Sequence, residues 1–157
     1  MTESVYIETS MVSYLTARPS NNLIMMANQE VTQKWWNTRR NQFTLYVSQV
    51  VLDEAAQGDP EMALKRIEVL KSLFVLELTE NVQDLGLQFL TRSSIPAKAS
   101  DDAIHIAAAT VHGLDYMLTW NCKHIANAQI QRKLVEISAS CGYKLPTICT
   151  PYELMGE

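Results

Sequence analysis

The sequence predicts an α/β fold in which a mainly parallel sheet is covered by helices on both faces. Short runs rich in β-branched and aromatic residues alternate with segments of helical periodicity along the 157 residues. Residues that favour helix starts follow most of the short runs. Strands joined through helices of ten or more residues form right-handed crossovers, which give parallel sheets.

The composition favours one globular domain, residues 1–157, because 47% of the residues are hydrophobic and 19% are charged. The formal net charge of −4 means that a nucleic-acid partner would need a local site rather than bulk attraction. The three cysteines form no CxxC pair, which argues against a disulfide framework or a zinc knuckle. The N-terminus lacks the features of a signal peptide and no apolar run has membrane length, so we expect a cytoplasmic protein that does not enter a membrane.

The first strand is expected at residues 4–8 and ends in the carboxylate of Glu8. Thr9 and Ser10 can cap the short helix that follows, and a longer helix is expected at residues 22–40. The end of that longer helix holds two tryptophans and two arginines. They could form a base-stacking platform or a core edge with a solvated charged end, and we favour the core edge: Trp35, Trp36, Arg39 and Arg40.

The second strand is expected at residues 43–47. Ser48 caps the next helix, which carries Glu54 in its second turn and stops at Gly58. Asp59 and Pro60 begin a helix that continues to about Ser72. The elements that follow are a strand at 73–78, a helix from Thr79 to about 92, a strand at 115–119, a helix at 126–140, a strand at 147–149 and a final turn capped by Thr150 and Pro151.

The stretch 99–121 contains a helix followed by a strand, with polar residues before the helix and after the strand. Ser100 is expected to be the N-cap, and Asp101 and Asp102 fall in the first turn, where the helix dipole favours negative charge. Gly113 suits the end of the helix, and Asn121 lies just past the next strand. Acidic residues at a helix start are ordinary capping chemistry, so their meaning depends on what lies beside them.

Ligands of parallel sheets bind at the carboxyl ends of the strands. If the first and fourth strands are neighbours, Glu8, Glu54, Asp102 and Asn121 converge there. Carboxylates gathered without lysines repel one another unless a cation lies among them, and an all-oxygen set favours Mg²⁺ or Mn²⁺. Such ions activate water and stabilise displacement at a phosphodiester, so the residues favour a hydrolase.

The chain also resembles a known family over nearly its whole length. The segments that carry the resemblance are VYIETS, SQVVLDEA, SDDAIHIAAATVHGLDYMLTWNCKHIAN and ICTPYEL, and they are similar to the PIN domain and its VapC-type toxin subgroup. The resemblance implies a three-layer α/β/α sandwich with strand order 3-2-1-4-5 and metal-dependent endoribonuclease activity on RNA. It also implies a toxin that pairs with a small antitoxin and forms a homodimer.

By this resemblance the catalytic and metal-binding positions fall on Glu8, Glu54, Asp102 and Asn121, with Ser10 as a small hydroxyl residue near the site. Two positions depart from the family, which usually has aspartate at the first and often at the fourth. Glu8 extends its carboxylate by one methylene, roughly 1.5 Å, and Asn121 offers a carbonyl oxygen without charge. We therefore expect one divalent ion, weak or Mn²⁺-selective activity, and Asn121 either completing the metal shell or orienting water.

Neighbouring residues leave further alternatives. His105 could assist proton transfer or hold phosphate, or simply pack on its helix face. Lys123 and His124 could contact RNA phosphates, whereas Asp101 is expected to face solvent and Cys122 is assigned no role. Two rival functions also stand: a PIN-like module that has lost catalysis and serves in binding or assembly, and a metal phosphohydrolase for small molecules.

Overall fold

Five parallel strands form the centre of the fold, in the order β3-β2-β1-β4-β5. The computed structural model describes residues 2–156, so the expected domain limits at residues 1 and 157 lie outside the described residues. The expected parallel sheet and its strand order are confirmed. The strands are β1 (Glu3–Ile7), β2 (Phe43–Ser48), β3 (Phe74–Leu76), β4 (Tyr116–Leu118) and β5 (Thr147–Cys149).

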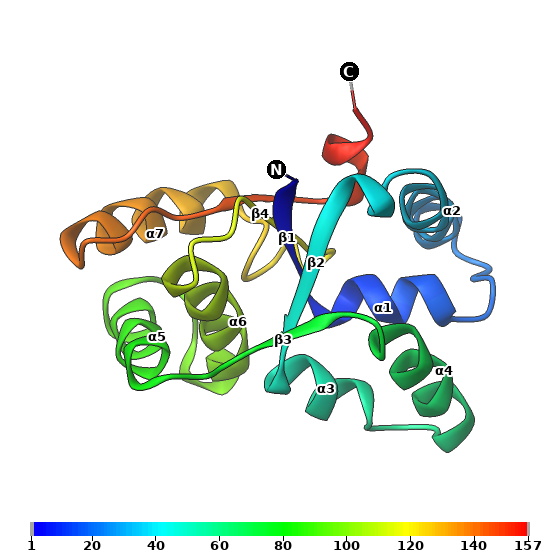
Figure 1. Cartoon of the computed structure of the whole chain (residues 1–157), viewed down its shortest axis with the longest axis horizontal. Helices are drawn as coiled ribbons and strands as arrows, with labels where there is room; N and C mark the ends of the chain where they lie inside the picture. The colour runs from blue at the N-terminus through cyan, green and yellow to red at the C-terminus, as the bar shows by residue number, and fades with distance from the viewer. Residues whose placement is uncertain (1, 157) are drawn as a thin grey trace.

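Helices cover both faces of the sheet, as the sequence predicts. Helices α5, α6 and α7 lie on one side of the strands and α1 to α4 on the other (Figure 1). The helices are α1 (Thr9–Thr16), α2 (Leu23–Thr38), α3 (Gln49–Ala55), α4 (Pro60–Leu70), α5 (Glu80–Arg92), α6 (Ser100–Val111) and α7 (Ala128–Ser140), with short 3₁₀ turns η1 (Arg40–Gln42), η2 (Ala97–Ala99) and η3 (Pro151–Leu154). Within residues 2–156, no helix combines the length and the apolar character needed to cross a membrane.

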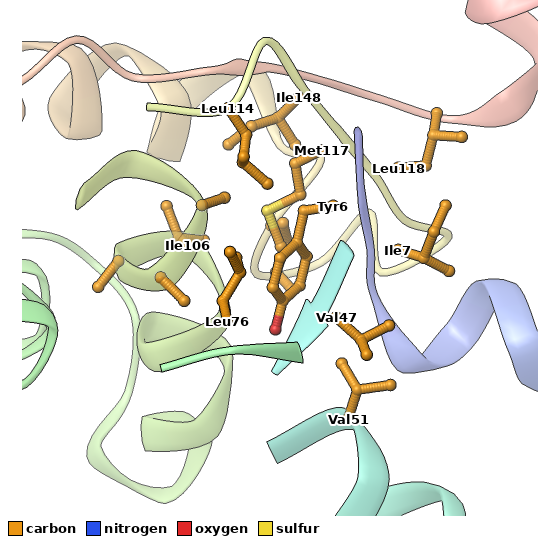
Figure 2. Packing of buried hydrophobic residues seen from close by; sticks show 14 of the residues in the cluster. Tyr6, Ile7, Val47, Val51, Leu76, Ile106, Leu114, Met117, Leu118 and Ile148 are labelled. Atoms are coloured by element: carbon orange, nitrogen blue, oxygen red, sulfur yellow. The ribbon is translucent and has the colours of Figure 1, made fainter. Parts of the chain in front are cut away.

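Consecutive strand residues point to opposite faces of the sheet, and this divides the core into two layers. Tyr6 and Met117 lie on the α6 side, whereas Ile7 and Leu118 lie on the side of α1 and α3 (Figure 2). All four side chains are fully buried. Apolar packing on both faces therefore fixes β1 and β4 side by side at the middle of the sheet.

The register of β1 and β4 decides where the first polar residues after them lie. Ile7 pairs with Leu118, and the Glu8 amide donates to the Leu118 carbonyl at 3.1 Å. The chain grows outward from β1 to β2 and β3, and then crosses back to place β4 on the other side of β1. Glu8 and Thr119 consequently emerge next to each other at the point where the sheet reverses its direction of growth.

Several element ends differ from the sequence prediction. The N-cap of α6 is Ala99, not Ser100, because the η2 turn runs into α6 and Ser100 already has helical φ and ψ of −59° and −32°. Helix α7 begins at Ala128 rather than at 126, because the Asn127 side chain caps the amides of residues 129 and 130. The strands β3 and β4 are shorter than expected, and α2 ends at Thr38.

The aromatic and basic residues at the end of α2 form a core edge, as favoured above. Trp35 is fully buried and its indole N–H donates to the Leu154 carbonyl at 2.9 Å. Trp36 is half-buried beneath the Arg40 guanidinium, whose central carbon lies 5.0 Å from the ring centroid. Both tryptophans therefore make their contacts within the protein.

Candidate active site

Glu8 is a buried carboxylate at the carboxyl end of β1. One of its oxygens accepts hydrogen bonds from the Ser10 hydroxyl and the Thr119 hydroxyl, each at 2.5 Å. The other oxygen accepts from the Ser10 amide at 3.2 Å, which makes Glu8 the N-cap of α1. Three donors thus offset the cost of burying this charge.

Glu54 and His105 form a second pair beside Glu8. His105 is fully buried on α6, and its Nε2 lies 2.6 Å from Glu54 Oε1. The Thr9 hydroxyl donates to the same carboxylate oxygen at 2.5 Å. On its other side, His105 Nδ1 lies 2.7 Å from the Tyr6 hydroxyl, which is 2.8 Å from the Ser48 hydroxyl. The imidazole is therefore held at both nitrogens.

The pKa values of this pair shift in matching directions. Burial lowers the pKa of His105, but the Glu54 hydrogen bond and the negative charges of Glu8, Glu54 and Asp102 outweigh burial and raise it above its ordinary value. Burial raises the pKa of Glu54, but the hydrogen bond and charge of His105, with a hydrogen bond from Thr9, bring it below its ordinary value. Both directions favour an imidazolium beside a carboxylate.

Asp102 is linked to Glu8 by a chain of hydrogen bonds through the loop after β4. Asp102 Oδ2 lies 3.1 Å from His124 Nδ1, and the His124 amide donates to the side-chain carbonyl of Asn121 at 3.0 Å. The Asn121 amide donates to the Thr119 hydroxyl at 2.9 Å, and that hydroxyl donates to Glu8. Asn121 thus shapes the loop that connects the two carboxylates.

Of the four predicted ligands, the structure brings Glu8 and Glu54 together at one edge of the sheet. Ligand atoms of Glu8, Glu54 and His105 all lie within 4.8 Å of one another. Asp102 is not one of these three, but its charge acts on the same imidazole. Glu8 and Glu54 meet at His105, and Asp102 lies three residues before His105 on α6, so we regard this edge as the candidate active site.

The oxygen atoms of this site fit a hard divalent cation. Hydrogen bonds to Glu54 and Asp102 within the described residues each use one carboxylate oxygen and leave the second one open. These two side chains are 28% and 17% exposed, so both reach solvent. Across residues 2–156, the ion pairs at these carboxylates involve histidines and no lysine or arginine. Carboxylate oxygens are the donors that Mg²⁺ and Mn²⁺ prefer.

No protein-family model matches the sequence, and no curated protein matches it. The structure is nevertheless similar to that of Mycobacterium tuberculosis VapC20, described as a sarcin-ricin loop cleaving toxin, with a TM-score of 0.60, 15% identity, and coverage of 76% of this chain and 91% of that chain. It is also similar to VapBC2 from Rickettsia felis bound to a DNA fragment from their promoter, with a TM-score of 0.55, 12% identity and coverage of 83% and 92%. The fold is VapC-like. The expected PIN-like α/β/α architecture is therefore confirmed.

Within this VapC-like fold, sequence reasoning missed the residues that hold the carboxylates in place. Thr119 and Thr9 each donate to a site carboxylate, and Tyr6 holds the far side of His105. Thr119 directly follows β4 and Thr9 is the first residue of α1, and these positions at the carboxyl edge of the sheet are a sequence signal for both residues. Tyr6 carries no comparable signal, because an aromatic residue inside a strand is predicted to be a core residue.

The structure also settles the surroundings of the neighbouring residues. His105 is packed inside the site and bonded on both sides rather than open to solvent. His124 contacts Asp102, whereas Lys123, Asp101 and Cys122 are exposed.

Proposed function

We propose that this chain is a metal-dependent endoribonuclease whose ion is held by Glu8, Glu54 and Asp102. The single observation that carries the proposal is that Glu8 and Glu54 meet at the buried imidazole of His105, which lies one helical turn from Asp102. Two of those carboxylates keep an open oxygen that reaches solvent. Histidines contact one oxygen each of Glu54 and Asp102, and the remaining oxygens, which lie where parallel sheets bind ligands, favour a cation.

The chain's own residues hold this arrangement in place. A bound Mg²⁺ or Mn²⁺ would activate water and stabilise charge at the phosphodiester. Ser10 and Thr119 orient the carboxylate of Glu8, while His105 and Thr9 orient that of Glu54. His124 orients Asp102, and Asn121 fixes the loop that carries His124 or orients the attacking water.

The described activities of the similar structures support a more specific proposal. VapC20 is described as cleaving the sarcin-ricin loop, so we propose a structured RNA as the substrate of this chain. VapBC2 is described as bound to a DNA fragment from their promoter. On that likeness we propose that this chain is the toxin of a toxin–antitoxin pair and is inhibited by a small antitoxin that covers the acidic edge. From the family resemblance of its sequence we further propose that it acts as a homodimer.

RNA cleavage by purified protein tests the proposal. We expect cleavage of an RNA stem–loop with added Mn²⁺, none in EDTA, and a loss on the order of 100-fold in Asp102→Asn. Asp101→Asn is the matched control, because Asp101 is the preceding residue in the same helical turn but is exposed. Equal cleavage by Asp102→Asn and Asp101→Asn would contradict the assignment.

A second candidate is a PIN-like module without catalysis. It is favoured by two observations: three donors already occupy the Glu8 carboxylate, and the Asn121 carbonyl already accepts a hydrogen bond from His124. A module of this kind would show no Mn²⁺ binding that depends on Asp102. Metal binding measured alongside RNA cleavage therefore separates the two candidates.

A further inference from the structure

Two segments beside the acidic edge are basic although the chain as a whole is acidic. The sequence has 13 Lys and Arg residues against 17 Asp and Glu residues. The segments 92–98 and 121–135 nevertheless contain no Asp or Glu. They contain five exposed basic residues, which we call the basic strip: Arg92, Lys98, Lys123, Arg132 and Lys133.

Side-chain contacts hold the segment 92–98 against α7, which carries part of the second segment. The Lys133 ammonium donates to the Ser94 hydroxyl at 2.7 Å, and the Arg92 guanidinium donates to the Ser140 hydroxyl at 3.0 Å. A hollow of about 610 Å³ lies between them, lined by Ser94, Arg132 and Lys133 among others, with Glu136 as its one acidic residue. Helices α5 and α7, which carry much of the strip, lie on the same side of the sheet (Figure 1).

The strip extends to the candidate active site at its other end. The Asn127 side chain donates to the Lys123 carbonyl at 3.1 Å, which ties the loop after β4 to the start of α7. In the same loop, His124 contacts Asp102 at 3.1 Å. Lys98 lies in η2, directly before the helix whose first turn holds Asp102. Positive charge therefore adjoins the carboxylates on the α6 and α7 side.

The charges of the strip are free to bind an anion. Within residues 2–156, the ion pairs formed by lysine or arginine join Arg18 to Glu61 and Lys71 to Glu68, and neither involves the strip. Exposed unpaired lysines and arginines release counterions when they meet phosphates, and this release favours binding. A carboxylate cluster repels a polyanion, so a nuclease of this kind needs adjacent positive charge to hold its substrate.

We propose that the basic strip binds the phosphate backbone of RNA and leads the strand to the acidic edge. The inference rests on the proposed nuclease function and deepens it, because it names the surface that holds the substrate. Charge complementarity favours RNA as the occupant. The strip supplies position and affinity without reading sequence, because its side chains meet phosphates rather than base edges.

Binding of a fluorescein-labelled RNA stem–loop in EDTA, followed by anisotropy over a range of salt, tests the strip without cleavage. The double variant Arg132→Gln/Lys133→Gln is compared with Lys34→Gln/Lys65→Gln, which removes the same charge from exposed positions on α2 and α4. We expect the strip variant to bind roughly tenfold more weakly and to lower the salt slope of log K by roughly one to two. The α2 and α4 variant should match the wild-type protein.

A second double variant, Lys98→Gln/Lys123→Gln, should show a similar loss of RNA affinity. Thermal melting checks that both strip variants remain folded. Equal RNA affinity and equal salt slope in the strip and control variants would overturn the proposal that the basic strip binds RNA. If the wild-type protein cleaves RNA with Mn²⁺ and the strip variants bind and cleave RNA like the control, RNA binding by the strip is contradicted, whereas the proposed nuclease function is supported. Strip-dependent RNA binding without cleavage by the wild-type protein would support the strip and contradict the nuclease. If the strip binds polyglutamate but not RNA, RNA is contradicted as its ligand and an acidic protein takes that place.

Discussion

The imidazole of His105, which is fully buried, lies 2.6 Å from the carboxylate of Glu54 and is held on its other side by the Tyr6 hydroxyl. This pair joins α3 to α6 across the edge where Glu8 ends β1. Glu8, Glu54 and Asp102 all raise the pKa of this imidazole against the effect of burial. Glu8 and Glu54 thus meet at His105, one helical turn from Asp102, and His105 is the first target for substitution.

Replacing His105 with alanine should destabilise the protein by about 3 kcal/mol, because removal of one partner of a buried pair leaves the other groups without theirs. Tyr6 and Glu54 each lose a hydrogen bond in this variant. Urea unfolding of His112→Ala provides the control, since His112 closes the same helix and bonds a carbonyl at the surface. Equal losses in the two variants would contradict a structural role for the His105 pair.

Stability of the metal-free protein should depend on pH through the same pair. The folded pKa of His105 is raised, so its contribution is complete below its ordinary value of 6.5 and is lost as the pH rises through the higher folded value. The folded pKa of Glu54 is lowered, so its contribution is complete above its ordinary value of 4.5 and is lost as the pH falls through the lower folded value. Unfolding measured from acid to alkaline pH in EDTA should therefore show a maximum between these two ordinary values. In His105→Gln, the free energy of unfolding should fall less steeply on the alkaline side of this maximum. An unchanged fall would mean that other titrating groups cause it.

Thr119, the residue directly after β4, donates a hydrogen bond to the Glu8 carboxylate. Thr119→Val keeps the shape of the side chain but removes the hydroxyl, and the loss of this donor should cost about 1–3 kcal/mol in the free energy of unfolding. RNA cleavage should fall with it, because Glu8 is no longer fixed. Thr119→Ser restores the hydroxyl and should recover most of both properties. Failure of serine to rescue would mean that packing of the threonine methyl, not the hydrogen bond, matters here.

The site is built for glutamate rather than aspartate at position 8. The Ser10 and Thr119 hydroxyls both meet one Glu8 oxygen at 2.5 Å, and aspartate would withdraw that oxygen by roughly 1.5 Å. We therefore expect Glu8→Asp to cleave RNA on the order of tenfold more slowly, although aspartate is the residue that PIN domains usually have there. Initial cleavage rates under saturating Mn²⁺ check this expectation. Faster cleavage by the variant would show that Glu8 is a weakened ligand.

Most of the fold is predictable from the sequence because strands and helices carry strong local signals. The apolar runs of β1, β2 and β5 and the caps at Asn22, Asp59 and Thr79 specify their elements directly. The cap of α6 is not predictable in this way, because the preceding 3₁₀ turn replaces a side-chain cap at Ala99.

The site is less predictable, because its supports come from residues that look like core or cap. The convergence of Glu8, Glu54 and Asp102 follows from strand order and the rule that ligands bind at carboxyl ends. The bonds of Tyr6 and Thr119 to site residues depend on the register of β1 with its neighbours, which one sequence does not specify. The roles of the four predicted ligands stay predictions until metal binding is measured.

Calorimetric titration with Mn²⁺ measures ion binding at the carboxylates without requiring the natural RNA. We expect one ion per chain in the wild-type protein and in Asp101→Asn. Glu54→Gln and Asp102→Asn should bind it at least on the order of tenfold more weakly. Mn²⁺ binding that is absent from the wild-type protein, or unchanged in both site variants, would contradict a metal site formed by Glu8, Glu54 and Asp102.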